Sequence, residues 1–158
     1  MQPRIIQGKE KKGFGQSLAM SVTKNLTSKL WRGFMPRKVE IENRAGADFI
    51  SLQVYPPKYH ITFNPESEFK EYPLVEVFGY ATIPEGMEKF ALKAGPYVVF
   101  DYKGASGDPS IFQYIYAMWL PKSGYVLDDR PHFEVLGPNY KNDNPNSEEE
   151  IWIPIKQL

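Results

Sequence analysis

The chain has no cysteine, only two histidines and no excess of either charge among its 158 residues. Without cysteine, a disulfide framework and thiolate metal sites are excluded, and His60 and His132 lie too far apart to suggest a zinc site. Lys plus Arg and Asp plus Glu both number 19, and the basic residues form no stripe of the kind that nucleic-acid binders carry. We therefore expect no metal, no cofactor and no direct binding of DNA or RNA.

Long apolar runs are missing as well. The amino-terminal "MQPRIIQGKEKKGFG" lacks the apolar stretch of a signal peptide, and no segment is long and apolar enough to span a bilayer. We expect a cytoplasmic chain that does not insert into membranes. At this length a single domain over residues 1–158 is the simplest arrangement.

Motifs of enzymes are scarce. There is no G-x-S-x-G sequence, no P-loop and no dinucleotide glycine pattern, and neither histidine has a nucleophile nearby in the sequence. We assign no catalytic residue. One enzymatic hypothesis stays open: Glu134 and Glu150, on neighbouring strands, could push their pKa values apart so that one serves as a general base.

Aromatic residues are what the chain has in excess. Ten tyrosines, ten phenylalanines and three tryptophans make up 15% of the sequence, more than a small core usually needs. Amphipathic rings of this kind also build the walls of sites for flat organic ligands.

The order of the predicted elements occurs twice. The first half has the extended segment "PRIIQGKEKKGFGQSLAMS", a helix over residues 22–34 that ends at Pro36, and the strands "FISLQVY" and "LVEVFGYATI". The second half has the extended "EKFALKAGPYVVFDYKG", a helix that Asp108 caps and that runs from Pro109 to Pro121, and the strands "HFEVLG" and "EIWIPIK". The pattern predicts an α+β fold of two tandem pseudo-symmetric β-α-β-β repeats, about residues 1–84 and 85–158.

The two helices end alike, with Trp31 in "LWRGFMPR" and Trp119 in "MWLPKSGY" each shortly before a proline. Alternation along the strands separates two faces. We expect the helices to cover Ile50, Leu52, Val54, Phe133, Val135, Ile151, Ile153 and Ile155. The opposite face then holds Phe49, Tyr55, Glu134, Leu136, Glu150 and Trp152, a mixture typical of neither a core nor a solvated surface.

Glu134 is the main candidate for a binding residue. A glutamate among aromatic side chains loses solvation, and its charge is disfavoured by several kcal/mol unless a cation or hydrogen-bond donors compensate. An organic cation would gain Coulomb energy from such a carboxylate and cation-π contact with nearby rings. The alternative is that Glu134 points to water, as most strand glutamates do. Glu150 and Trp152 on the last strand are further candidates, as is Tyr80, because Gly79 beside it permits close approach of another backbone.

The sequence resembles the GyrI-like small-molecule-binding domain, which is the effector-binding domain of AraC-type and MerR-type multidrug-responsive transcription regulators. The likeness rests on "AMWLPKSGY", "RPHFEVLGPNY" and "EEEIWIPIK", with "GFGQSLAMS" and "NLTSKLWRGFMPR" in the first half. It implies a cleft between the two repeats that takes up lipophilic, often cationic compounds, with Glu134 as the buried counter-charge and Glu150 and Trp152 as contributors. The expected ligand-binding set is Glu134, Glu150, Trp152, Tyr55, Phe49, Tyr80, Leu136, Trp119 and Trp31.

The regulators of this type also carry a helix-turn-helix domain, for which two repeats in 158 residues leave no room. We therefore expect a stand-alone effector-binding domain, acting as a ligand sensor or sequestering protein linked to transcription regulation. Two alternatives stay open: a glutamate-dependent hydrolase of the same fold, and a protein-interaction module resembling gyrase inhibitors or co-regulators. A protein partner or a homodimer is compatible with each of these functions.

Overall fold

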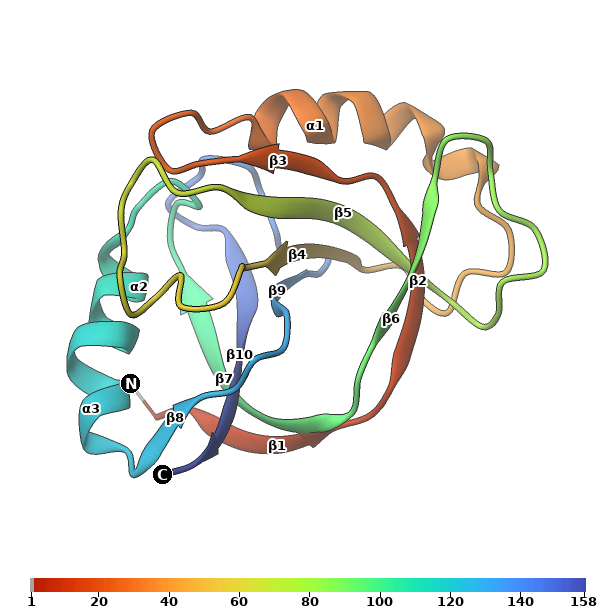
Figure 1. Cartoon of the computed structure of the whole chain (residues 1–158). Coiled ribbons are helices and arrows are strands. Elements are labelled where there is room, and N and C mark those ends of the chain that lie inside the picture. Colours follow the sequence, from red (N-terminus) through yellow and green to blue (C-terminus); the bar gives the residue numbers. More distant parts are fainter. Residues whose placement is uncertain (1) are drawn as a thin grey trace.

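The computed structural model describes residues 2–158, which form a ten-stranded antiparallel sheet with two short helical segments on one side (Figure 1). The fold is α+β, as the sequence predicted. In chain order the elements are β1 (Arg4–Gly8), β2 (Lys11–Gly15), β3 (Leu18–Met20), α1 (Thr27–Phe34), η1 (Met35–Glu40), β4 (Phe49–Val54), β5 (Phe69–Val77), β6 (Glu88–Leu92), β7 (Gly95–Lys103), α2 (Ser110–Tyr114), η2 (Ile115–Trp119), α3 (Leu120–Lys122), β8 (Tyr125–Leu127), β9 (His132–Leu136) and β10 (Glu148–Gln157).

The strand order is β1-β7-β10-β9-β4-β5-β2-β6, with β3 beside β5 and β8 beside β10. β1 and β2 follow each other along one chain segment, and they pair with β7 and β6 respectively, which also follow each other. These two long segments curl around and close the sheet into a barrel-like ring (Figure 1). β4 and β9 pair with each other at the middle of the strand order.

The sheet has a core on each side. On the inside of the ring, a cluster that includes Leu52, Tyr97 and Phe133 fills the space between the strands. On the outside, α1 packs over one cluster that contains Phe34 and Val75, and α2 with η2 packs over another that contains Ile115 and Ile153. On the outer face, α1 thus covers β2 and β5, and α2 with η2 covers β7 and β10. β4 and β9 lie between these two helical segments.

The helix-covered face is partly the reverse of the predicted one. Ile151, Ile153 and Ile155 do pack against the helices. Ile50 and Leu52, however, belong with Phe133 to the cluster inside the ring. The reason is that the closed sheet buries its own inner face, so an apolar set on a strand needs no helix to cover it.

The predicted helix boundaries also shift. The first helix begins at Thr27 rather than near Val22. Just before it, Asn25 Oδ1 accepts a hydrogen bond from the Thr27 N–H at 2.9 Å, which holds residues 25–27 in a turn. A 3-10 turn carries the chain past Pro36. The second helical segment passes Pro121 as well, after the π-helical turn η2 changes the hydrogen-bond spacing ahead of a residue that has no N–H to donate.

The strand predicted as "LVEVFGYATI" begins five residues earlier, at Phe69, and ends at Val77. Phe78 is largely exposed and Tyr80 lies in the loop beyond the strand. Residues 69–73, which precede the predicted strand, therefore belong to β5 and bring Glu71 into the sheet.

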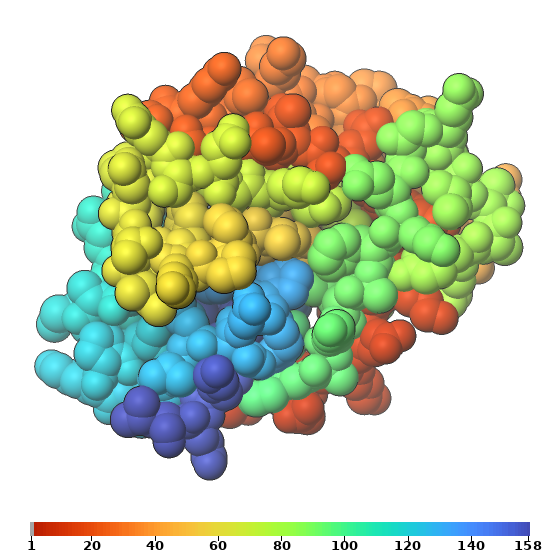
Figure 2. Space-filling view, viewed as in Figure 1, coloured from red at the N-terminus to blue at the C-terminus, as the bar shows by residue number. Residues whose placement is uncertain are grey.

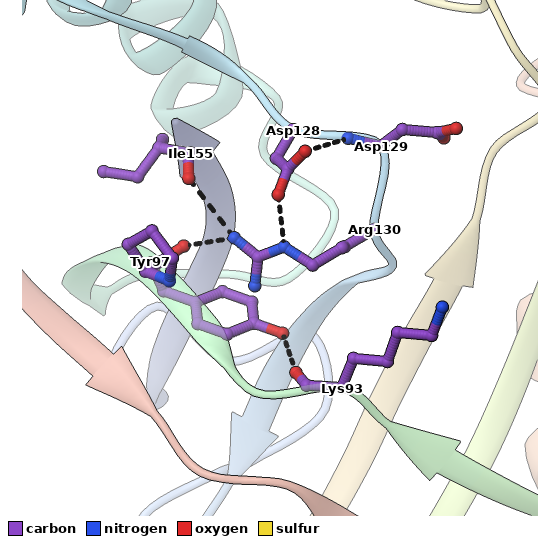
Figure 3. A network of polar contacts seen from close by, with 7 residues as sticks. Lys93, Tyr97, Asp128, Asp129, Arg130 and Ile155 are labelled. Atoms are coloured by element: carbon purple, nitrogen blue, oxygen red, sulfur yellow. Dashed lines mark hydrogen bonds and ion pairs between the residues drawn. The ribbon is translucent and has the colours of Figure 1, made fainter. Parts of the chain in front are cut away.

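Arg130 fixes the entry to β9 (Figure 3). Its Nε donates to Asp128 Oδ2 at 2.6 Å, and its Nη2 donates to the carbonyl oxygens of Ile155 and Pro96. The guanidinium also lies 4.5 Å from the centre of the Tyr97 ring. Because one side chain ties β7, β10 and the loop before β9 together, the strand that carries Glu134 has a defined position.

Within residues 2–158, no helix has the length and apolar character that crossing a membrane would require.

Candidate ligand site

Glu134 lies at the centre of the structure, on β9 between β4 and β10. Ser51 is its partner on β4 and Ile151 its partner on β10. Residues directly opposite in antiparallel strands point to the same face. Glu134 therefore points to the helix-covered face, into the space between the two helical segments, and it is partly buried there.

Two further glutamates point to the same face. Glu71, on β5, is the partner of Gln53 on β4 and is 2% exposed. Glu149, on β10, is two residues from Ile151 and so shares its face, where it is partly buried. Among residues 2–158, no Lys or Arg forms an ion pair with any of these three carboxylates. The middle of the face therefore carries acidic groups without a protein cation.

Glu71 is held by neighbours on β4. Ser51 Oγ donates a hydrogen bond to Glu71 Oε1, and Gln53 Nε2 donates to Glu71 Oε2 at 2.9 Å. Gln53 Nε2 also lies 3.2 Å from Ser51 Oγ. The row from Glu71 through Ser51 to Glu134 crosses three adjacent strands, so one hydroxyl group stands between two carboxyl groups.

Burial changes the pKa values of all three glutamates. Loss of solvation raises the pKa of Glu71 to about 7, although its hydrogen bonds from Ser51 and Gln53 act in the opposite direction. Loss of solvation likewise raises the pKa of Glu149 to about 7. Burial raises the pKa of Glu134 well above its ordinary value, the charges of Glu149 and Glu71 raise it further, and Ser51 acts in the opposite direction. Between about pH 4.5 and 7, these three carboxyl groups therefore hold protons that isolated glutamates would have released.

Aromatic rings enclose one end of this row. Residues 55–68, which we call the strap, connect β4 to β5 and lie against the second helical segment (Figure 2). His60 in the strap stacks on Tyr116 at 5.3 Å and on His132 at 5.0 Å between ring centres. Tyr116 Oη lies 3.1 Å from His132 Nδ1, and Tyr55 packs edge-on against His132 at 4.9 Å. Burial lowers the pKa of His132 to about 3, so its ring is neutral.

Two shallow cavities lie away from Glu134. One of about 250 Å³ runs along the second helical segment and is lined by Trp119, and one of about 230 Å³ lies beside Gly79. Glu134 lines neither of them. The aromatic rings of the strap occupy the space at one end of the acidic row, and the cleft expected between the two repeats stays a prediction.

Of the predicted site residues, Phe49, Tyr55 and Leu136 share the face of Glu134. Leu136 is the partner of Phe49 across the β4–β9 pair, and Phe49 packs edge-on against Trp31 of α1. Trp31 and Tyr80 pack on the cluster beneath α1, and Trp119 packs on Phe100 beneath η2. Trp31, Tyr80 and Trp119 therefore pack in the two clusters that the helical segments cover, and not beside the acidic row.

Glu150 and Trp152 lie on the other face. Trp152 stacks on Phe133 at 5.1 Å between ring centres and belongs to the inner core, and its Nε1 donates to Glu150 Oε1 at 3.0 Å. Glu150 also accepts a hydrogen bond from Arg4 at 3.2 Å. The expectation that both residues share a face with Glu134 is wrong, because Glu134 pairs with Ile151 and the side chains alternate from there.

The sequence analysis missed Glu71, Glu149, Ser51, Gln53 and Tyr116. Glu149 could have been found, since it has the same spacing as Ile151, Ile153 and Ile155, which were expected beneath the helices. Glu71 could not, because a strand beginning at Phe69 has no pattern that separates it from the polar loop before it.

Known proteins have related sequences. A sequence model of integron-associated effector binding proteins matches residues 4–155. The transcriptional regulator BrlR of Pseudomonas aeruginosa is 28% identical over 159 residues, covering 98% of this chain and 56% of BrlR, so the chain spans about half of that relative's length.

Solved structures agree in fold. SAV2435, in a structure bound to tetraphenylphosphonium, superposes with a TM-score of 0.73 at 16% identity, over 99% of this chain and 94% of that one. The integron cassette protein VCH_CASS2 from the mobile metagenome of Vibrio cholerae superposes with a TM-score of 0.66 at 14% identity, over 98% and 95% of the two chains. Together with the family match over residues 4–155, these findings confirm the GyrI-like resemblance, and the chain belongs to the integron-associated effector-binding protein family.

Proposed function

We propose that this chain binds lipophilic organic cations on the helix-covered face of its sheet, with Glu134 as the counter-charge. The observation that carries the proposal is the row of Glu71, Glu134 and Glu149, which lacks a Lys or Arg partner within residues 2–158. Buried carboxylates are stabilised when a cation lies beside them, and here the protein leaves that cation to be supplied from outside.

The surroundings of the row suit a ligand with aromatic surface. Tyr55, Tyr59 and Tyr116 lie at one end of it, and Phe49 lies on the same face toward α1. A flat or propeller-shaped cation could gain cation-π and apolar contact from such rings while its charge approaches Glu134. The related fold of SAV2435 in its structure with tetraphenylphosphonium supports this class of ligand.

The effector-binding family and the likeness to BrlR support a link to transcription regulation. We propose that the chain serves as a ligand-sensing or ligand-sequestering unit, and that it responds to binding of the cation on the face that carries Glu134. A glutamate-dependent hydrolase would convert its ligand, whereas the proposed binder returns it unchanged.

The test is a fluorescence titration with tetraphenylphosphonium, with triphenylphosphine oxide as a neutral analogue. We expect binding of the cation at micromolar concentration and weaker binding of the neutral compound. Glu134→Gln should weaken cation binding by about 10- to 150-fold, the loss expected when a charge-assisted contact of about 1.5 to 3 kcal/mol is removed.

Glu150→Gln is the matched control, because it removes the same charge from the other face of the sheet. It should leave the affinity for the cation unchanged. Equal losses in the two variants would place the ligand elsewhere, and absence of cation binding in the parent protein would overturn the proposal.

A further inference from the structure

The row Glu71–Ser51–Glu134 has one hydroxyl proton for two carboxyl groups. The Ser51 hydroxyl donates a hydrogen bond to Glu71 Oε1, and Gln53 Nε2 donates one to Glu71 Oε2. Glu134 stands opposite Ser51 across the β4–β9 pair. Because Ser51 has one hydroxyl hydrogen, it can donate to only one of the two carboxyl groups, and the other carboxyl group can hydrogen-bond to Ser51 only as a donor that carries a proton itself.

The groups that face Glu134 offer no positive charge to replace that proton. From β5 it faces Glu71, from β4 Ser51 and Gln53, and from β10 Glu149. Tyrosines complete the surroundings, with Tyr55 at the end of β4, Tyr116 on η2 and Tyr140 in the loop after β9; burial raises the pKa of each, so these rings stay neutral. His132 on β9 and His60 in the strap both have lowered pKa values because they are buried.

We propose that the ligand-free site stores at least one proton on Glu71, Ser51 and Glu134, and that binding of an organic cation expels it. The exchange is balanced: the protonated site and the cation give the occupied site and one free proton, with no change in total charge. Glu71, from the other half of the chain, is then a specificity-determining residue, because it adds the second negative charge that becomes available once the proton has left. This inference rests on the proposed function and says how the same face distinguishes a cation from a neutral molecule of the same shape.

The exchange predicts that cation affinity depends on pH while the affinity of a neutral analogue does not. Below neutral pH the cation must displace a proton, so its affinity should rise up to about tenfold for each pH unit. Once the carboxyl groups are ionised in the free protein, the affinity should level off. A permanently charged probe is needed, so that the pH dependence belongs to the protein alone.

Isothermal titration calorimetry with tetraphenylphosphonium provides the direct test. Titrations at pH 6.5 in buffers of different ionisation enthalpy give the number of protons released per cation bound, which we expect to be about one. In Glu71→Gln the repulsion that keeps Glu134 protonated is reduced. We therefore expect fewer protons to be released and the rise in affinity to move to lower pH.

Glu76→Gln serves as the control, because Glu76 is on the same strand but has the alternation of the other face and lies 4.0 Å from Lys11 Nζ. It should release the same number of protons as the parent protein. Cation binding without proton release would overturn this inference and leave the proposed function standing. Equal proton release in Glu71→Gln and the parent would remove Glu71 from the exchange and overturn its role. Failure of the parent protein to bind the cation at any pH would overturn both proposals.

Discussion

Glu71 is the residue whose burial has the clearest cost. Its side chain is 2% exposed, and its pKa is raised to about 7 from 4.5. The folded protein therefore binds a proton more tightly than the unfolded chain does. This tighter proton binding stabilises the folded protein at pH 4.5. That stabilisation, about 3 kcal/mol, is lost as the pH rises through 7.

Glu71→Gln should remove this loss. Relative to the parent protein, we expect the free energy of unfolding of the variant to increase by about 3 kcal/mol between pH 4.5 and pH 8, whatever constant offset the amide introduces. His132, with a pKa lowered to about 3, changes stability in the opposite direction below pH 6.5, but it does so in both proteins and cancels in the difference. Urea denaturation at the two pH values measures this difference, and a constant difference would show that Glu71 does not titrate in the folded protein.

The central strands show which parts of a site alternation can predict. It correctly separates Glu134 and Phe49 from their neighbours, and the GyrI-like resemblance points to Glu134 itself. It does not say which face a helix covers, because the closed ring buries an apolar set such as Ile50 and Leu52 without any helix. Nor does alternation fix the pairing of β9 with β10. A shift of that pairing by one residue would put Glu150 instead of Glu149 on the face of Glu134.

The two faces of β10 should therefore differ in what a substitution does. Trp152 packs between Phe133 and Tyr97 inside the ring, so Trp152→Ala should lower the free energy of unfolding by about 3 kcal/mol. Its effect on the affinity of the folded protein for tetraphenylphosphonium should be less than about twofold, since no direct contact is lost. Urea denaturation and a calorimetric titration measure the two quantities. A large loss of affinity in a variant that is still folded would place the ligand inside the ring.

The whole molecule is tied together by its longest segments. β1 and β2 come from the first half of the chain, yet β1 pairs with β7, and β6 from the second half pairs with β2. β4 and β9 join the halves again at the middle of the strand order. Each half also pairs strands of its own, but the pairs β1–β7, β2–β6 and β4–β9 join the halves along both edges and through the middle of the sheet. We therefore expect both halves to unfold in one cooperative transition.

The three tryptophans allow this expectation to be tested, because one lies in each core cluster. Trp31 of α1 packs on the cluster that α1 covers, Trp119 of η2 packs on the cluster that η2 covers, and Trp152 packs on the cluster inside the ring. In variants that keep one tryptophan and replace the other two by phenylalanine, urea unfolding should give the same midpoint by fluorescence as by far-UV circular dichroism of the same variant. Comparing the two signals within each variant removes the effect of the substitutions on overall stability. An earlier fluorescence transition for Trp31 alone would mean that the region beneath α1 unfolds separately, and a site built across both halves would then lose its β5 carboxylate before its β9 carboxylate.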